Sequence, residues 1–196
     1  MPTILECIVT TLNADGTVNV APMGPEVDDS MDRVVLKPFK TSTTYANVSR
    51  TRTAVVNVTD DVLLLAQAAV GALKTLPETR ACPGAEGAML ADACRWYALR
   101  CDHIDDRDDR VRIDTRVVAR GRLRDFFGFS RAKHAVVEAA ILATRVHMIP
   151  PEDLANQLST LEPLIAKTGS SREHEAFALL QKYTQHYAIA HKGGGR

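Results

Sequence analysis

Residues 13–24 read NADGTVNVAPMG, a tight turn followed by a short strand that ends at a proline. Gly16 can adopt a positive φ angle, and an Asp-Gly pair is typical of the turn in a β-hairpin. The preceding segment, residues 4–12, is also β-rich, so we expect two paired strands on either side of this turn. Pro22 and Gly24 then form a rigid exit whose backbone carries no bulky side chain.

Short strands dominate the first two thirds of the chain. Further segments with strand composition are residues 33–36, 53–58, 95–101 and 111–118, and residues 42–50 have the composition of a short crossover helix. An acidic turn over residues 105–109 joins the last two strands. A parallel sheet would need a longer helical pattern after each strand than this part supplies. We therefore expect a barrel.

The last third of the chain has the three- and four-residue spacing of amphipathic helices. One helix is expected to end at residues 150–151, two consecutive prolines. The next, over residues 152–167, contains Pro163, which should kink or split it. Ser170 and Glu173 stand at capping-box spacing and predict the start of a final helix.

The charge balance argues against a general attraction to polyanions. Lys plus Arg number 24 and Asp plus Glu number 24, so the formal net charge is zero. Nucleic acid and membranes are therefore not expected partners, and a bound anion must be held by a local site. No apolar stretch approaches the roughly 20 residues that cross a bilayer. The N-terminus has no basic region ahead of a long apolar run, so we expect a cytoplasmic protein.

The cysteines are scattered, without the close pairs that a structural zinc site uses. They are Cys7, Cys82, Cys94 and Cys101. We expect neither a bound metal nor a disulfide framework. Cys7 falls in a strand with no basic neighbour to lower its pKa, so we expect it to be a small buried apolar residue. His103 stands beside the acidic turn, where a solvated loop is a simpler interpretation than a metal site.

Residues 36–47 read LKPFKTSTTYAN and place two lysines and four consecutive hydroxyl residues between a strand and a short helix. Unpaired N–H groups at a helix N-terminus, together with lysine and hydroxyl donors, form a site for a phosphate. In the simpler alternative, Thr41 or Ser42 only caps the helix and the lysines are solvated. The proline–glycine exit at residues 22–24 favours the phosphate site, because its backbone can approach a planar ring.

Three pieces in this order, NADGTVNVAPMG, LKPFKTSTTYANV and TAVVNVTDD, resemble the flavin-reductase-like, FMN-binding split-barrel superfamily. Within it, the chain is similar to the family known as domain of unknown function 447, and the similarity continues through FFGFSRAKHAVVEAAILATR. The resemblance implies an FMN-binding split β-barrel at residues 1–125, mainly β with some α. It also implies a C-terminal helical appendage packed on the barrel at residues 126–196, and a homodimer with the cofactor near the subunit interface.

The same resemblance implies which residues contact FMN. Pro22, Met23 and Gly24 fall beside the flavin ring. The phosphate is expected beside a lysine and the hydroxyl run, which are Lys40, Thr41, Ser42, Thr43 and Thr44. Further candidates for the ribityl chain or the phosphate are Lys37, Phe39, Asn47 and Asn57.

No catalytic acid, base or nucleophile stands out, which suits a flavin enzyme because the cofactor supplies the redox chemistry. The leading hypothesis is an FMN-dependent oxidoreductase acting with an unidentified small-molecule electron donor or substrate. One alternative is a flavin-binding or carrier protein without turnover. Another is a split barrel that holds a deazaflavin or a pyridoxal phosphate derivative. No G-x-G-x-x-G follows a strand, so a built-in nicotinamide domain is not expected.

The helical appendage is expected to depend on the barrel for its stability, since its helices are short and each offers one apolar stripe. The phenylalanines of FFGF, residues 126–129, are expected to form interface core where the two parts meet. In the functional alternative, the appendage forms a wall of the pocket and Lys133 or His134 reaches toward the flavin. The glycine-rich tail from Lys192 to Arg196 is expected to fray.

Overall fold

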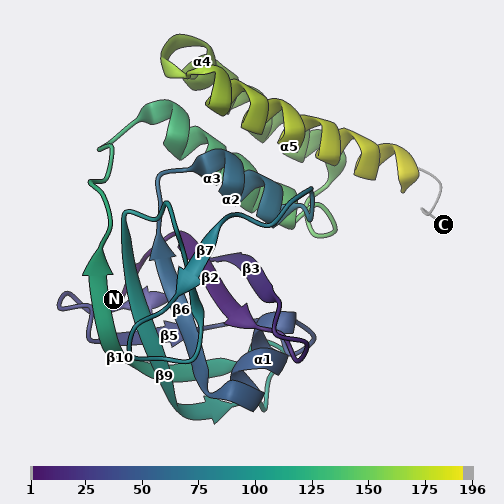
Figure 1. The fold of residues 1–196 in the computed structure, drawn as a ribbon. Helices are drawn as coiled ribbons and strands as arrows, with labels where there is room; N and C mark the ends of the chain where they lie inside the picture. Colours follow the sequence, from purple (N-terminus) through teal and green to yellow (C-terminus); the bar gives the residue numbers. More distant parts are fainter. Residues whose placement is uncertain (1, 192–196) are drawn as a thin grey trace. The chain divides into compact units, whose positions relative to one another are not determined.

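The computed structural model describes residues 2–191, so the tail from Lys192 to Arg196, expected to fray, lies outside the described residues. The fold divides into two compact units (Figure 1). One, here called the sheet unit, holds the residues up to Asp60 together with Thr75–Phe126. The other, the helical unit, holds Asp61–Lys74 and the chain from Phe127 onward.

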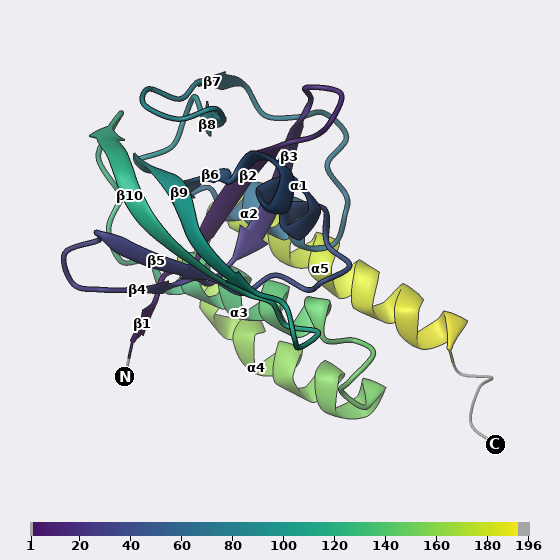
Figure 2. The same ribbon diagram turned by 90° about the horizontal axis from the view of Figure 1, so that it is seen from below.

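The sheet unit is built on one curled sheet of eight strands. These strands are β1 (Thr3–Ile4), β2 (Cys7–Leu12), β3 (Val18–Met23), β4 (Glu26–Val27), β5 (Arg33–Leu36), β6 (Thr53–Val58), β9 (Arg95–Asp105) and β10 (Arg112–Arg122). They lie in the order β1–β4–β5–β10–β9–β6–β2–β3, and every neighbouring pair is antiparallel (Figure 2). A separate two-stranded ladder pairs β7 (Thr79–Ala81) with β8 (Ala88–Leu90). Strands β1 and β3 are therefore the edges of the main sheet.

The central strands of this sheet are buried on both faces. Val56 and Leu99 belong to the larger apolar cluster, which joins β2, β5, β6, β9 and β10 inside the curl. Val55 and Ala98, one residue away along the same strands, lie on the opposite face with Met89 of β8. Burial on both faces explains why the segment 53–58 is apolar almost throughout instead of alternating with charged residues.

The hairpin predicted at residues 13–16 is present. Gly16 has a φ angle of 83°, and its N–H donates to the carbonyl of Asn13 at 3.0 Å. The strands predicted over 33–36 and 53–58 coincide with β5 and β6, while β9 and β10 are longer than predicted. Strands β1, β4, β7 and β8 were not predicted, because two or three residues are too few for a period to show.

A short helix, α1 (Thr43–Thr51), connects β5 to β6 and confirms the helix predicted over residues 42–50. It begins after Ser42, whose Oγ accepts a hydrogen bond from the backbone N–H of Tyr45 at 3.2 Å. It ends at Arg52, which takes the left-handed conformation with φ 57°. The helix contacts both β2 and β3, so its first turn lies near the edge of the sheet.

The helical unit contains four helices within the described residues. They are α2 (Val62–Ala69), α3 (Arg131–Thr144), α4 (Pro151–Thr168) and α5 (Ser171–Ala190). Helix α2 contacts both α3 and α5, although about 60 residues of chain separate it from α3. It was not predicted, because the segment VLLLAQAA is apolar on all sides and shows no helical period.

Two ion pairs link the helices of this unit. Arg172 of α5 lies 2.6 Å from the carboxylate of Asp61, which also caps α2 by accepting from the N–H of Leu64. Lys133 of α3 lies 3.4 Å from Glu173 of α5, where Glu173 forms the predicted capping box with Ser170. Helix α5 is therefore fastened at its first turn to both α2 and α3.

Two expectations for the helical part differ from the structure. Helix α4 continues through Pro163, so the expected split does not occur. Its buried stripe has members on both sides of the proline, Leu158 and Ile165, and this burial offsets the one backbone hydrogen bond that a proline removes. The three rings of FFGF are exposed, at 48% for Phe126, 74% for Phe127 and 95% for Phe129, so they do not form the core expected of them.

No helix in the described chain is long and apolar enough to cross a membrane.

We expect a fragment of residues 131–196 not to unfold cooperatively by itself, because it lacks α2 and the Asp61 carboxylate that α5 pairs with. A second fragment, in which residues 61–74 are joined through a short Gly-Ser linker to residue 127 and the remaining chain, should gain a cooperative transition. Far-UV circular dichroism during urea unfolding measures both. A cooperative transition of equal midpoint in the shorter fragment would contradict the role given to α2.

Candidate functional site

The first turn of α1 offers free hydrogen-bond donors. The backbone N–H groups of Thr43 and Thr44 have no acceptor within residues 2–191, as is usual at the start of a helix. Thr41 and Thr43 are exposed, and neither hydroxyl is bonded to another part of the described chain. Ser42 uses its oxygen as the cap but keeps its O–H as a donor. Amide and hydroxyl donors thus meet at the helix end that attracts anions.

Thr44 and Asn47 face the β2–β3 hairpin and are buried, at 2% and 5% exposed. Asn19 Nδ2 donates to both Thr44 Oγ1 and Thr11 Oγ1, each at 3.2 Å. Asn47 Nδ2 donates to Thr11 Oγ1 at 3.0 Å and to Asn13 Oδ1 at 2.8 Å. Three of these hydrogen bonds join α1 to the hairpin, and the one from Asn19 to Thr11 links the two strands of the hairpin to each other. Thr44 and Asn47 therefore position the helix, and their side chains are not directed at a ligand.

Lys40 is exposed, and hydrogen bonds to the turn between β9 and β10 orient it. Its Nζ donates to the carbonyl of Asp106 at 2.7 Å, and its backbone N–H donates to the carbonyl of Asp109 at 2.8 Å. The hydroxyl of Tyr45 donates to the Asp106 carboxylate at 2.7 Å, and this hydrogen bond raises the pKa of Tyr45. An ammonium group has three donors, so Lys40 keeps two for an anion at the start of α1.

The side chains of Lys37 and Phe39 both have partners within the sheet unit. Lys37 forms an ion pair with Glu26. The guanidinium of Arg110 lies 4.2 Å from the centre of the Phe39 ring and donates to the Lys37 carbonyl at 3.0 Å. The charge of Lys37 is therefore offset, and one face of the half-exposed Phe39 ring is covered.

Residues 22–24 lie at the end of the edge strand β3, and all three are half-buried. An added Cβ at Gly24 would come within 2.8 Å of the side chains of Glu6 and Ile4, so a larger residue there would have to displace them. The thiol of Cys7 donates to the Met23 carbonyl at 3.3 Å. Burial, reinforced by the charge of Glu6, raises the pKa of Cys7, so this thiol stays protonated, as its expected apolar role requires.

Asn57 is completely buried, and the sheet uses its amide group. Its Nδ2 donates to the Ile8 carbonyl at 3.2 Å and to Thr10 Oγ1 at 3.1 Å. Its Oδ1 accepts from the backbone N–H of Leu90 at 2.8 Å. Asn57 therefore holds β8 against β6 and β2, and it has no free surface with which to contact a cofactor.

Lys133 and His134 are engaged within the helical unit. The Nζ of Lys133 lies 5.5 Å from the centre of the Phe127 ring as well as beside Glu173, and the His134 ring meets the Phe129 ring edge-on at 5.9 Å. Burial opposes ionisation of Glu173, but hydrogen bonds from Ser170 and the charge of Lys133 outweigh it and lower the pKa. The ammonium of Lys133 therefore has a structural partner.

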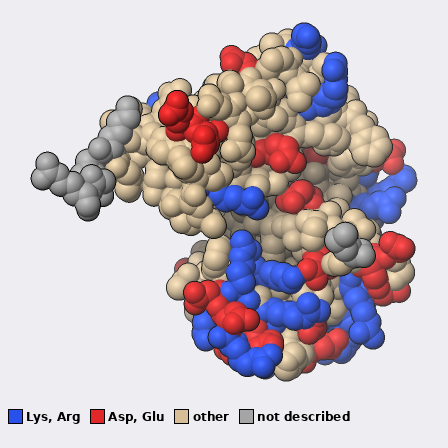
Figure 3. Space-filling view, turned by 180° about the vertical axis from the view of Figure 1, so that it is seen from behind, with Lys and Arg blue, Asp and Glu red and all other residues tan. Residues whose placement is uncertain are grey.

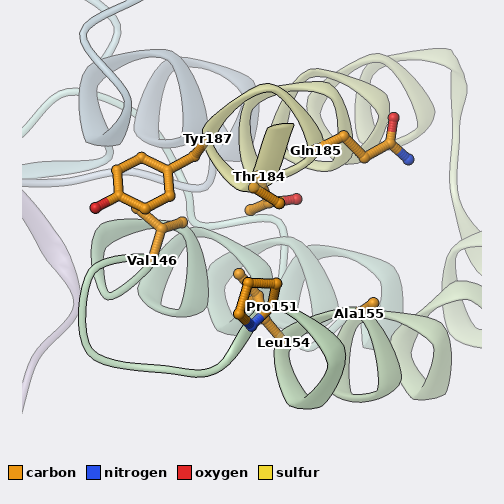
Figure 4. A pocket seen from close by; sticks show the side chains of 8 residues that line it. Val146, Pro151, Leu154, Ala155, Thr184, Gln185 and Tyr187 are labelled. Carbon is orange, nitrogen blue, oxygen red and sulfur yellow. The ribbon is translucent and has the colours of Figure 1, made fainter. Parts of the chain in front are cut away.

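A small hollow in the helical unit is a poor alternative site for a nucleotide. Val146, Leu154 and Tyr187 line it together with Thr184 and Gln185, and it encloses about 80 Å³ (Figure 4). Pockets that hold cofactor-sized ligands usually measure about 300–1,000 Å³. No charged side chain lines this hollow, so it offers nothing to balance a phosphate.

The titratable side chains described at these two segments are Lys40, Tyr45 and Asp106 beside α1 and Glu6 beside Gly24. Within residues 2–191, no three His, Cys, Asp or Glu side chains are grouped closely enough to hold a metal ion. His103 is exposed on β9. The donors at α1 and the backbone at the end of β3 are suited to binding and orienting a ligand.

Five residues of this region were not predicted to be part of it. They are Thr11, Asn13, Asn19, Tyr45 and Asp106. The sequence contains an indication for Thr11 and Asn19, since both are polar residues on largely apolar strands and so call for a polar partner. Nothing in the sequence indicated that Asp106 belongs to this region, because an acidic turn is typical of a solvated loop and Asp106 is 61 residues from Tyr45 along the chain.

Two protein-family models match the sequence. Residues 5–124 match the family model described as "Protein of unknown function (DUF447) N-terminal domain", and residues 130–182 match "Protein of unknown function (DUF447)". No curated protein is significantly similar to the sequence.

Solved structures share the fold. An FMN-bound protein from Methanosarcina mazei, assigned to the same family model, is 24% identical, with a TM-score of 0.80 over 93% of this chain and 96% of that one. The 2-nitrobenzoate 2-nitroreductase of Pseudomonas fluorescens is 17% identical, with a TM-score of 0.51 over 62% of this chain and 65% of that one. An FMN-binding protein from Thermus thermophilus is 12% identical, with a TM-score of 0.50 over 63% and 72%. The split barrel with C-terminal helices is thereby confirmed.

We expect Asn57→Ala to lower the free energy of unfolding by about 1–3 kcal/mol, because the buried N–H of Leu90 loses its acceptor. Urea unfolding without added flavin measures the change. Asn156→Ala, at an exposed position of α4, is the matched control and should stay within about 0.5 kcal/mol of the parent. Unchanged stability combined with lost flavin binding would instead make Asn57 a ligand contact.

Proposed function

The chain belongs to the DUF447 family, and from that premise we propose that it binds FMN, with the phosphate at the first turn of α1 and the flavin ring beside the end of β3. The observation that carries the proposal is the set of donors at α1. Two backbone N–H groups with no acceptor among the described residues, an oriented lysine and three available hydroxyl groups converge where the helix dipole attracts a phosphate. The FMN-bound relative from Methanosarcina mazei supports the choice of FMN.

The distance between the two segments supports a ligand with a ring at one end and a phosphate at the other. Asn19 is bonded to Thr44 in the first turn of α1, and Met23 lies four residues further along β3. A strand rises about 3.3 Å per residue, so these positions are about 13 Å apart. A planar ring joined to a phosphate by a short polyol arm fits such a span.

The proposed contacts follow from the geometry. Lys40, Thr41, Ser42 and Thr43 would hold the phosphate, and residues 22–24 would border the ring. Thr44 and Asn47 hold the helix in place, and Lys37 and Phe39 remain candidates for the ribityl arm only if their present partners are displaced. Asn57 is left out of the site because it is fully buried.

We further propose that the protein is an FMN-dependent oxidoreductase that acts on a small molecule. When bound, the flavin would supply the redox chemistry, and the chain would bind the cofactor and orient it. The half-buried backbone at residues 22–24 would border the ring. The protonated thiol of Cys7 is not available as a nucleophile.

A flavin-binding protein without turnover would use the same residues. The two functions differ in whether the bound flavin is reduced by a diffusible donor. Anaerobic addition of NADH or NADPH should bleach the flavin absorbance of an oxidoreductase that uses either donor, with dithionite as the control that reduces any bound flavin. Reduction by dithionite alone would favour the carrier function or a different donor.

We expect FMN to bind more tightly than riboflavin, and Thr41→Ala combined with Thr43→Ala to weaken FMN binding about 10- to 100-fold. Both hydroxyl groups are exposed and Ser42 is left in place, so the helix cap survives. Fluorescence titration with the two flavins measures the effect, and riboflavin affinity should not change.

The matched control is Ser159→Ala combined with Thr160→Ala, two exposed hydroxyl residues on α4, which should leave both titrations unchanged. Equal affinity of the parent protein for riboflavin and FMN would contradict a phosphate site at α1.

We also expect a homodimer in the cytoplasm, formed mainly through the sheet unit. Within residues 2–191, strand β3 has a partner on one side only, and the ring would lie beside this open edge. Pro22 removes one backbone donor from the edge, which disfavours uncontrolled strand addition without closing the edge. Sedimentation velocity at micromolar concentration should give the dimer mass, and a monomer under those conditions would contradict the expectation.

A further inference from the structure

Three arginines form a lateral row across neighbouring strands of the sheet unit, here called the arginine row. In the register of the sheet, Arg116 of β10 stands directly opposite Arg33 of β5 on one side and Arg100 of β9 on the other. Neighbouring strands lie about 4.8 Å apart, so the row spans about 10 Å. All three side chains are exposed.

The row lies on the face of the sheet opposite the core cluster inside the curl. Val34 and Thr115, the next residues along β5 and β10, are buried, and successive residues of a strand point to opposite faces. On β2, the hydroxyl of Thr10 donates to the Ala88 carbonyl of β8 on the outer face of the sheet. Thr11 is the next residue of β2, so its side chain points to the inner face, where it bonds to Asn47 of α1. The arginine row and the start of α1 are therefore separate surfaces.

The positive charge of the row is only partly balanced. Asp102 forms an ion pair with Arg116. The side chains of Arg33 and Arg100 have no acceptor in the part of the chain that the structure describes. The nearby carboxylates of Glu26 and Asp114 are already paired with Lys37 and Arg112. Within residues 2–191, one carboxylate is thus paired with the three arginines, in a protein whose formal net charge is zero.

Such an arrangement weakens the fold when no ligand is present. Like charges directly opposite one another on neighbouring strands are destabilising. On the face drawn in Figure 3, Lys and Arg side chains gather on this unit, with Asp and Glu side chains around them. The arginine row has one paired carboxylate within the described residues, and positions that reduce stability are often retained for binding.

We propose that the arginine row binds the diphosphate group of a small molecule. Arginine presents a planar fork of donors that matches phosphate oxygens, and two neighbouring guanidinium groups can hold one phosphate between them. Two linked phosphates can engage all three members of a row of this length. This ligand is distinct from the cofactor proposed above, and the inference does not depend on flavin binding.

The test compares the full-length protein with the variant Arg33→Gln combined with Arg100→Gln. Inorganic pyrophosphate is the probe, and binding is measured by calorimetry and by the rise in the thermal unfolding midpoint at low ionic strength. We expect pyrophosphate to bind the parent at least tenfold more tightly than inorganic phosphate. The double variant should lose at least tenfold in pyrophosphate affinity.

A second readout separates binding from structure. Without ligand, the double variant should be at least as stable as the parent in low salt, because the like-charge repulsion is removed, and the difference should shrink in high salt. Arg80→Gln, at an exposed arginine of β7, is the matched control and should change neither property. FMN titration of the double variant should be unchanged, which keeps this test independent of the flavin site.

Comparison of ADP with pyrophosphate distinguishes the possible sources of the group. Tighter binding of ADP through the same arginines assigns the ligand to nucleotides, and equal binding assigns it to the bare diphosphate. Absence of pyrophosphate binding to the parent, or equal binding by the double variant, would overturn the proposal. A clear loss of stability in the ligand-free double variant would also overturn it, since the arginines would then serve the fold.

Discussion

The hydrogen bonds from Asn47 to Thr11 and Asn13 attach α1 to the β2–β3 hairpin, and the candidate site depends on them. A helix of nine residues is too short to hold its place by its own backbone bonds. Its first turn is useful for binding only because these buried amide contacts hold it beside the edge strand. Asn19 completes the attachment from the other strand of the hairpin and sets the distance between the donors of α1 and residues 22–24.

Two adjacent acidic residues mark the point where the chain leaves the sheet unit. Asp60 pairs with Arg124, at 2.6 Å, at the end of β10, so both belong to the sheet unit. Asp61 caps α2 and pairs with Arg172, so it belongs to the helical unit. The pairing explains why the motif TDD carries two carboxylates in succession, since each one satisfies a different arginine on a different part of the fold.

Burial separates binding residues from structural ones more clearly than residue type does. Thr41 and Thr44 are three positions apart in one hydroxyl run, yet one is exposed and the other is hydrogen-bonded inside. Asn47 and Asn57 both looked suited to a polar ligand, but each has its amide bonded to the protein. A buried amide that makes several hydrogen bonds stabilises the fold and is costly to redirect. The residues proposed to contact the phosphate are therefore the exposed members of the run and Lys40.

The sequence by itself determined the features that depend on near neighbours along the chain. The hairpin turn at Gly16, the capping box of α5 and the strands β5 and β6 follow from turn chemistry and short-range periods, and all were predicted. Only the tertiary structure decided which distant residues meet. The contact between Tyr45 and Asp106, the place of α2 among later helices and the alignment of three arginines depend on strand register and chain crossings. These are set by packing over 60 or more residues, and no local pattern records them.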